Sequence, residues 1–142
     1  MRWWRHWRRW LGRRRQPLTL GQRGEMAAAR YLRRLGYKII ARGQRSRGGE
    51  LDIIAVDGRT VVFVEVKTRT SDVAGQPLDA ITADKQRRLT RAALTYMKRH
   101  DLLECSCRFD VVSVVWPERA KRPEIEHLQN AFEAVGRGQM FS

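Results

Sequence analysis

The sequence predicts an α/β domain in which a mixed β-sheet is flanked by helices, with the element order α-β-β-β-α-β. Two stretches with helical spacing of apolar residues, 20–35 and 79–100, enclose a strand pattern that turns at Asp57-Gly58. A run of β-branched residues at 108–116 follows the second stretch. The length of 142 residues fits one domain, because single cores are usually built from about 100 to 150 residues.

The first helix is predicted over residues 20–35, and Gly36 is placed to end it. A short apolar strand is expected next, over residues 37–42. Residues 42–49 are rich in glycine and arginine, so we expect a mobile, cationic loop there.

A hairpin is predicted from strands at residues 50–56 and 60–68, with Asp57 and Gly58 as its two loop residues. This dipeptide tolerates the positive φ angles of a tight hairpin turn. In that register Asp52 faces Phe63.

The C-terminal half is predicted to begin with the helix at 79–100, which lies on the sheet with its basic residues elsewhere. The β-branched run at 108–116 indicates an interior strand. The last segment, 124–132, is expected to be a short strand that runs into a helical turn.

Charge is the strongest bulk property of the chain. Lys and Arg number 29 against 15 Asp and Glu, which gives a formal net charge of +14. Residues 1–15 contain seven arginines and no acid, and the remainder of the chain still carries +7. A polyanionic partner is therefore expected, and charge alone leaves both nucleic acid and an anionic membrane open.

Residues 1–16 form a separate Trp/Arg-rich block, and a single folded domain is expected over residues 17–142. Trp3, Trp7 and Trp10 have the spacing of an amphipathic helix face. Such a block suits an anionic-membrane anchor or an arm that binds phosphates and bases. The alternative is a poorly ordered extension outside the fold, which is the prediction we adopt.

Cys105 and Cys107 are too close in sequence to form a disulfide framework, and a metal or redox role would need more ligands. No window reaches the roughly 18 apolar residues of a membrane span. No apolar segment of a signal peptide follows the basic N-terminus. We therefore predict a cytoplasmic protein without a membrane partner.

Acidic and basic residues interrupt the apolar hairpin on one predicted face. Strand alternation groups Glu50, Asp52, Glu65 and Lys67 there, and it points Leu51, Ile53, Val62, Val64 and Val66 the other way. Two carboxylates on neighbouring strands can close on one hard cation, and an adjacent lysine can stabilise charge on a phosphate. The alternative is a set of cross-strand ion pairs, each contributing a fraction of a kcal/mol.

Several motifs together resemble the YraN family of small bacterial proteins. They are Gly24-Glu25, G-E-L-D-I-I-A (49–55), V-F-V-E-V-K-T-R (62–69), R-F-D-V-V (108–112) and I-E-H-L-Q-N-A-F (125–132). The resemblance extends from about residue 20 to residue 132. That family is regarded as a branch of the PD-(D/E)xK restriction-endonuclease-like superfamily, close to archaeal Holliday-junction resolvases.

The resemblance implies a restriction-endonuclease-like fold and a Mg²⁺-dependent endonuclease, with Mn²⁺ as a substitute. Asp52, Glu65 and the backbone carbonyl of Val66 would hold the metal, with Glu25 as an extra acid. Glu25 and Lys67 would assist catalysis. The superfamily's proline before the aspartate is absent here.

The substrate implied is branched or broken DNA, in DNA repair or recombination, and cleavage of two strands would favour a two-fold homodimer. The alternative is a non-catalytic nucleic-acid-binding accessory module with the same fold. Phosphate contacts are expected from basic residues near the proposed metal site, with an ordinary solvated helix face as the alternative for Lys85. The candidates are Arg42, Arg45, Arg47, Arg69 and Lys85.

Two polar residues near the C-terminus are predicted to be structural. Asp110 interrupts an apolar strand, so we expect a buried, hydrogen-bonded acid or the partner of an arginine. His127 is expected to be a packed or surface residue without a catalytic role.

Overall fold

The computed structural model describes residues 16–46, 48–71 and 81–134. The predicted N-terminal tryptophans and Arg47 lie outside these residues. The elements are α2 (Leu20–Arg34), β1 (Lys38–Ser46), β2 (Gly49–Asp57), β3 (Thr60–Arg69), α3 (Ala83–Arg99), β4 (Ser106–Val115) and β5 (Glu124–Phe132). No helix within the described ranges is long and apolar enough to cross a membrane.

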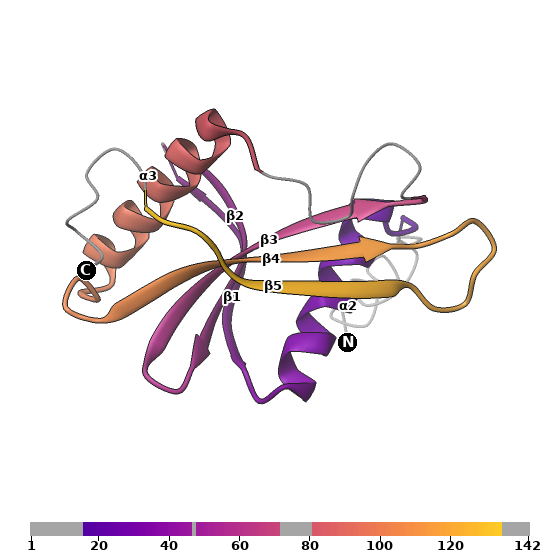
Figure 1. The fold of residues 1–142 in the computed structure, drawn as a ribbon, viewed down its shortest axis with the longest axis horizontal. Helices are drawn as coiled ribbons and strands as arrows, with labels where there is room; N and C mark the ends of the chain where they lie inside the picture. Colours follow the sequence, from indigo (N-terminus) through magenta and orange to yellow (C-terminus); the bar gives the residue numbers. More distant parts are fainter. Residues whose placement is uncertain (1–15, 47, 72–80, 135–142) are drawn as a thin grey trace, which may run out of the picture.

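The five strands form one mixed sheet in the order β1-β2-β3-β4-β5. Only the β3–β4 pair is parallel, and α3 lies in the crossover that joins these two strands. Each face of the sheet has its own apolar core, one packed against α2 and the other against α3. Figure 1 shows the two helices on the two sides of the twisted sheet. The predicted restriction-endonuclease-like α/β fold is thereby confirmed.

The ends of α2 follow from its sequence. The Thr19 side chain accepts a hydrogen bond from the Gln22 N–H, and the Gln22 side chain accepts one from the Thr19 N–H. This capping box satisfies donors that the first helical turn leaves unpaired. Gly36, at φ +94°, stops the helix where the sequence predicts.

The prediction of a loop over residues 42–49 is largely wrong. β1 continues to Ser46, and its backbone pairs with β2 from Arg42↔Ile53 to Ser46↔Gly49. β1 is an edge strand with mostly exposed side chains, so arginines and a glycine fit it without burial of charge.

The helical turn predicted at the end of residues 124–132 is also wrong, because all of Glu124–Phe132 is strand. The pairing of β4 with β5 shifts between Phe109↔Phe132 and Val111↔Leu128. Asn130 adopts φ +50° within this irregularity, a conformation that asparagine tolerates better than most residues. A bulge of this kind interrupts side-chain alternation and thus obscures the strand in the sequence.

The hairpin is present, but its register differs from the prediction. Asp57 pairs with Thr60, so the loop residues are Gly58 and Arg59. Gly58 has φ +62°, and a two-residue loop with glycine first needs a positive φ only there. The same register, continued one step beyond Ile53↔Val64, places Asp52 opposite Glu65.

β2 separates from β3 beyond the Ile53↔Val64 pair. Figure 1 shows the β1–β2 end turning up beside α3 while β3 continues with β4 and β5. Gly48 allows this approach, because an added Cβ would lie 2.8 Å from the backbone nitrogen of Ala92 in α3. Leu51 therefore packs in the α3 core, and the prediction that it shares a face with Ile53 is wrong.

Candidate metal centre

Asp52 lies at the point where β2 and β3 separate. Its Oδ2 atom accepts a hydrogen bond of 2.9 Å from the Val66 N–H. Since strand pairing ends one residue earlier, this side chain satisfies a β3 donor that the β2 backbone no longer reaches. The carboxylate is thereby fixed between the two diverging strands.

Helix α2 brings a second acid to the same place. Gly24 packs so closely on β3 that an added Cβ would lie 1.9 Å from Thr68 Oγ1. The next residue, Glu25, is half-buried. Carboxylate oxygens of Glu25, Glu50 and Asp52 all lie within 4.8 Å of one another.

Glu65 is the fourth acid of this centre, and it is only 7% exposed. Its Oε1 lies 2.5 Å from Nζ of Lys85 in α3. The lysine is the cationic partner of Glu65, while the side chain of Glu65 also interacts with Asp52. All three layers of the fold, which are α2, the sheet and α3, therefore contribute a residue to the centre.

Burial and mutual repulsion raise the pKa values of two of these acids, Asp52 and Glu25. Burial and the nearby Glu65 carboxylate together raise the pKa of Asp52 to about 7, although the hydrogen bond from the Val66 N–H opposes the shift. Burial also raises the pKa of Glu25, assisted by Glu50, while Arg42 lowers it. The centre thus holds on to a proton near neutral pH, which a divalent cation would displace.

A cleft of about 210 Å³ opens at this centre. It is lined by Gly49, Glu50, Asp52, Glu65, Lys85, Arg88 and Leu89. Glu50 and Arg88 are exposed, so the acids are reached from solvent. Ligand oxygens on opposite sides of one Mg²⁺ are about 4.2 Å apart, given Mg–O distances of about 2.1 Å. Small side-chain adjustments would bring the Glu25, Glu50 and Asp52 oxygens to such spacing.

The predicted set of acids largely meets in the structure. Glu25, Asp52 and Glu65 converge, and Lys67 follows Glu65 by two residues on β3. Glu50, which the sequence places on the shared face without a metal role, joins Glu25 and Asp52. Its role depends on the path of β2 away from β3, which alternation does not predict.

The predicted phosphate-contacting residues lie at different distances from the acids. Arg42 is close enough to lower the pKa of Glu25. Arg45 lies opposite Glu50 in the backbone register of β1 and β2. Lys85 contacts Glu65 directly. Arg69 ends β3, where its carbonyl accepts a hydrogen bond from the Trp116 N–H.

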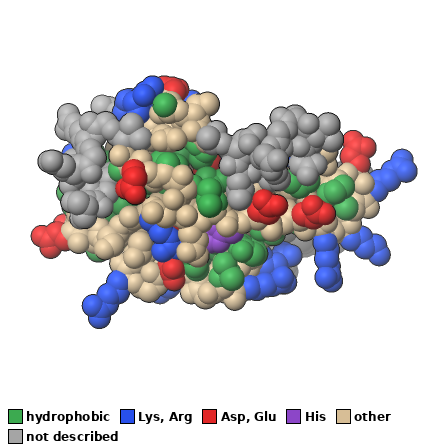
Figure 2. All heavy atoms as spheres, in the orientation of Figure 1, with side chains coloured by type: hydrophobic (Ala, Val, Ile, Leu, Met, Phe, Trp, Pro, Cys, Tyr) green, Lys and Arg blue, Asp and Glu red, His purple; other side chains and the backbone are tan. Residues whose placement is uncertain are grey.

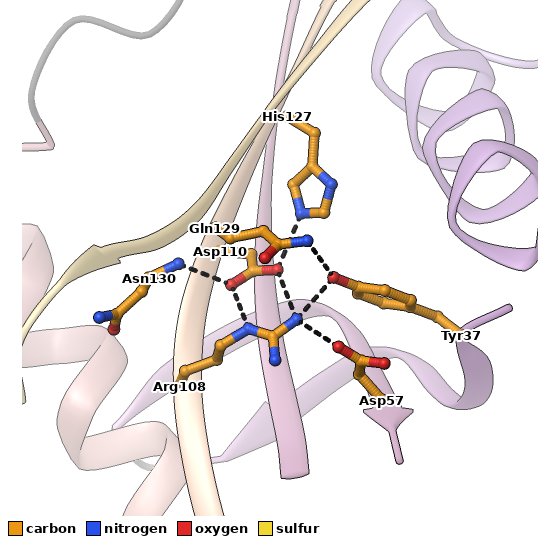
Figure 3. A network of polar contacts seen from close by, with 7 residues as sticks. All are labelled: Tyr37, Asp57, Arg108, Asp110, His127, Gln129 and Asn130. Atoms are coloured by element: carbon orange, nitrogen blue, oxygen red, sulfur yellow. Dashed lines mark hydrogen bonds and ion pairs between the residues drawn. The ribbon is translucent and has the colours of Figure 1, made fainter. Parts of the chain in front are cut away.

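A second polar network surrounds Asp110 on the α2 side of the sheet (Figure 3). Asp110 is fully buried, and it binds Arg108 Nε at 3.0 Å, His127 Nε2 at 2.8 Å and the Asn130 N–H at 3.0 Å. Arg108 also donates to Tyr37 and Asp57, and Gln129 donates to Tyr37.

This network confirms that Asp110 is a buried, hydrogen-bonded acid with an arginine partner, and that His127 is packed. Tyr37 and Gln129 were not predicted as members, because their positions depend on pairing across the whole sheet. Cys105 and Cys107 are both free thiols.

The sequence matches the uncharacterised protein family UPF0102 over residues 24–114, a range that contains all the acids of the centre. A UPF0102 protein of Rhodopirellula baltica is 52% identical over 120 residues, covering 82% of this chain and 72% of the relative. One from Geobacter metallireducens is 50% identical over 115 residues, covering 81% and 93%. One from Geobacter sulfurreducens is 51% identical over 116 residues, covering 80% and 88%.

Proposed function

The chain belongs to the UPF0102 (YraN) family, and we propose that its acidic cleft is the active site of a divalent-metal-dependent endonuclease acting on branched or structured DNA. The observation that carries the proposal is the convergence of four acids at an open cleft: Glu50, Asp52 and Glu65 line it, and Glu25 lies within 4.8 Å of Glu50 and Asp52. Burial and mutual repulsion make these clustered carboxylates costly to ionise, and a bound divalent cation would compensate that charge.

Mg²⁺ is the cation proposed, because carboxylate oxygens are its preferred protein ligands, and Mn²⁺ should replace it. Asp52, Glu65, Glu25 and the Val66 carbonyl would hold the metal, with Glu50 as a further ligand. A bound divalent cation would lower the pKa of a water molecule and offset charge on the scissile phosphate.

Two lysines would act on the phosphate, Lys85 from the lining of the cleft and Lys67 from β3. Lys67 lies on the strand of Glu65 and would stabilise negative charge that develops during hydrolysis. Lys85 supplies the positive charge beside Glu65, so a cation bound at Glu65 would free its ammonium group to contact DNA.

Arginines around the cleft would position the substrate. Arg42, Arg45 and Arg69 would contact phosphates, which orients DNA without reading its sequence. Cleavage of both strands of a junction would need two centres, and a two-fold homodimer would supply them.

The test is a cleavage panel with junction, flap, nicked and single-stranded DNA in Mg²⁺ and in Mn²⁺. We expect wild-type protein to cut at least one branched substrate, and Asp52→Ala or Glu65→Ala to abolish cleavage with little loss of DNA binding. Glu104→Gln, which removes an exposed acid from the turn after α3, is the matched control and should cut normally. If every substrate stays whole in both metals, the non-catalytic binding module is the better description.

A further inference from the structure

A second groove lies between α2 and the connection from β4 to β5, and its volume is about 360 Å³. Arg30 and Arg34 from α2 face Lys121 and Arg122 from the connection across it. Figure 2 shows Lys and Arg side chains projecting at the end of the molecule where Figure 1 places this connection.

The groove is purely cationic among its described lining residues, which include no carboxylate. The acids of β5 do not alter this. Ile125 packs toward the α2 core, so strand alternation directs the flanking Glu124 and Glu126 to the opposite face. A ligand with several negative charges is therefore favoured over a neutral or positively charged one.

Aromatic side chains form part of the same lining. Tyr31 and Trp116 both border the groove. The Trp116 indole is held in place, because its Nε1 donates to the Ala120 carbonyl at 2.9 Å and the Arg23 guanidinium lies 4.1 Å from the ring centroid. A fixed aromatic wall beside cations suits a ligand that combines flat rings with phosphates.

We propose that this groove binds a single-stranded segment of nucleic acid, with its phosphates on Arg30, Arg34, Lys121 and Arg122 and a base against the Tyr31–Trp116 wall. A duplex keeps its bases stacked inside, so it would offer the groove phosphates alone. An anionic lipid surface is flat, so it would make little contact with aromatic side chains that line a groove. The binding goes beyond the proposed nuclease activity, because it needs neither the metal nor the acidic cleft.

Trp116 provides a local reporter in the full-length chain. Replacing Trp3, Trp4, Trp7 and Trp10 by phenylalanine leaves it as the only tryptophan. With EDTA present, we expect a ten-nucleotide oligo(dT) to produce a saturable change in Trp116 fluorescence, and a ten-base-pair duplex to produce a much smaller one. The Asp52→Asn variant should give the same titration as its parent, which separates this proposal from the nuclease.

Two matched double variants locate the binding. Arg30→Gln with Lys121→Gln should weaken oligo(dT) binding about tenfold and reduce the slope of log affinity against log salt by about 1.4, as expected for two lost contacts to a single strand. Arg59→Gln with Lys98→Gln removes the same charge from exposed positions outside the groove, and it should change affinity less than about twofold.

Three results would overturn the proposal. One is oligonucleotide binding, seen by anisotropy, without a change in Trp116 fluorescence. Another is equal weakening by both double variants, which would indicate general attraction to the basic surface. The third is a larger fluorescence response to phosphatidylglycerol vesicles than to oligo(dT), which would assign the groove to an anionic lipid headgroup.

Discussion

Two aspartates interrupt apolar strands of the same sheet, and their surroundings are opposite. Burial raises the pKa of Asp110, but hydrogen bonds from His127, the Asn130 N–H and Arg108 outweigh burial and lower it. Burial and Glu65 raise the pKa of Asp52 to about 7, against a single N–H donor. The chain itself compensates the charge of Asp110, whereas it leaves the charge of Asp52 for a proton or a ligand to compensate.

The difference separates a structural acid from a candidate functional one. Asp110 joins β4 to the bulge in β5 and, through Arg108, to Tyr37 and the end of β2. Asp52 gathers like charges at a gap between strands. Substitutions around Asp110 should therefore change the free energy of unfolding, and substitutions around Asp52 should change the binding of a cation.

The largest effect is expected from Asp110→Asn. It leaves the charge of Arg108 without its principal partner in a part-buried position, and we expect a loss of about 3 to 5 kcal/mol in the free energy of unfolding. Urea denaturation measures this loss. Asp84→Asn breaks only exposed ion pairs with Arg87 and Arg88 and should cost less than about 1 kcal/mol. Equal losses in the two variants would contradict the structural role of Asp110.

The next effect tests the packing that brings Glu25 to the acids. Gly24→Ala places a methyl group against Thr68, a branched side chain that cannot turn away, and should cost about 1 to 3 kcal/mol by overpacking. It should also weaken Mn²⁺ binding, measured by titration calorimetry. Gly21→Ala, in the same helix, meets nothing closer than Thr19 Oγ1 at 4.0 Å and should stabilise the protein slightly. Similar results at both glycines would exclude the close approach.

Local patterns predict one of these two centres better than the other. Alternation along the hairpin is sufficient to place Asp52 and Glu65 on one face, even though the turn is one residue later than predicted. Members of the Asp110 network come from places that no local pattern links. Tyr37, which accepts from Gln129, precedes β1, and Gln129 and Asn130 lie at an irregularity of β5. Glu50 was placed on the face but not at the metal, because its position depends on the departure of β2 toward α3.

A metal titration of the wild-type protein should distinguish the two centres. Mg²⁺ at ten times its Kd would stabilise the folded state by about 1.4 kcal/mol, or roughly 4 °C in Tm. Because the cation competes with the proton on Asp52, the shift should be present at pH 8 and largely lost at pH 5.5. Differential scanning fluorimetry measures it, with Asp52→Asn as the control that removes the response. A shift of equal size at both pH values would place the cation elsewhere.

The last effect is the most discriminating, because its sign is opposite to that at Asp110. The pKa of Asp52 lies at about 7 in the fold against an ordinary value of 3.8, so folding favours the protonated form. Stability without metal should therefore fall as pH rises from about 4 to 7, and the full penalty remains above pH 7. Asn at this position keeps an oxygen for the Val66 N–H and removes the charge. In EDTA, Asp52→Asn should raise the free energy of unfolding at pH 8 by at least about 1 kcal/mol, because one pKa unit corresponds to about 1.4 kcal/mol. It should leave the free energy nearly unchanged at pH 3.5, where the wild-type acid is neutral in the folded chain and mostly neutral in the unfolded chain. A loss of stability at both pH values would mean that Asp52, like Asp110, is compensated by the chain itself, and that no cation is needed at the cleft.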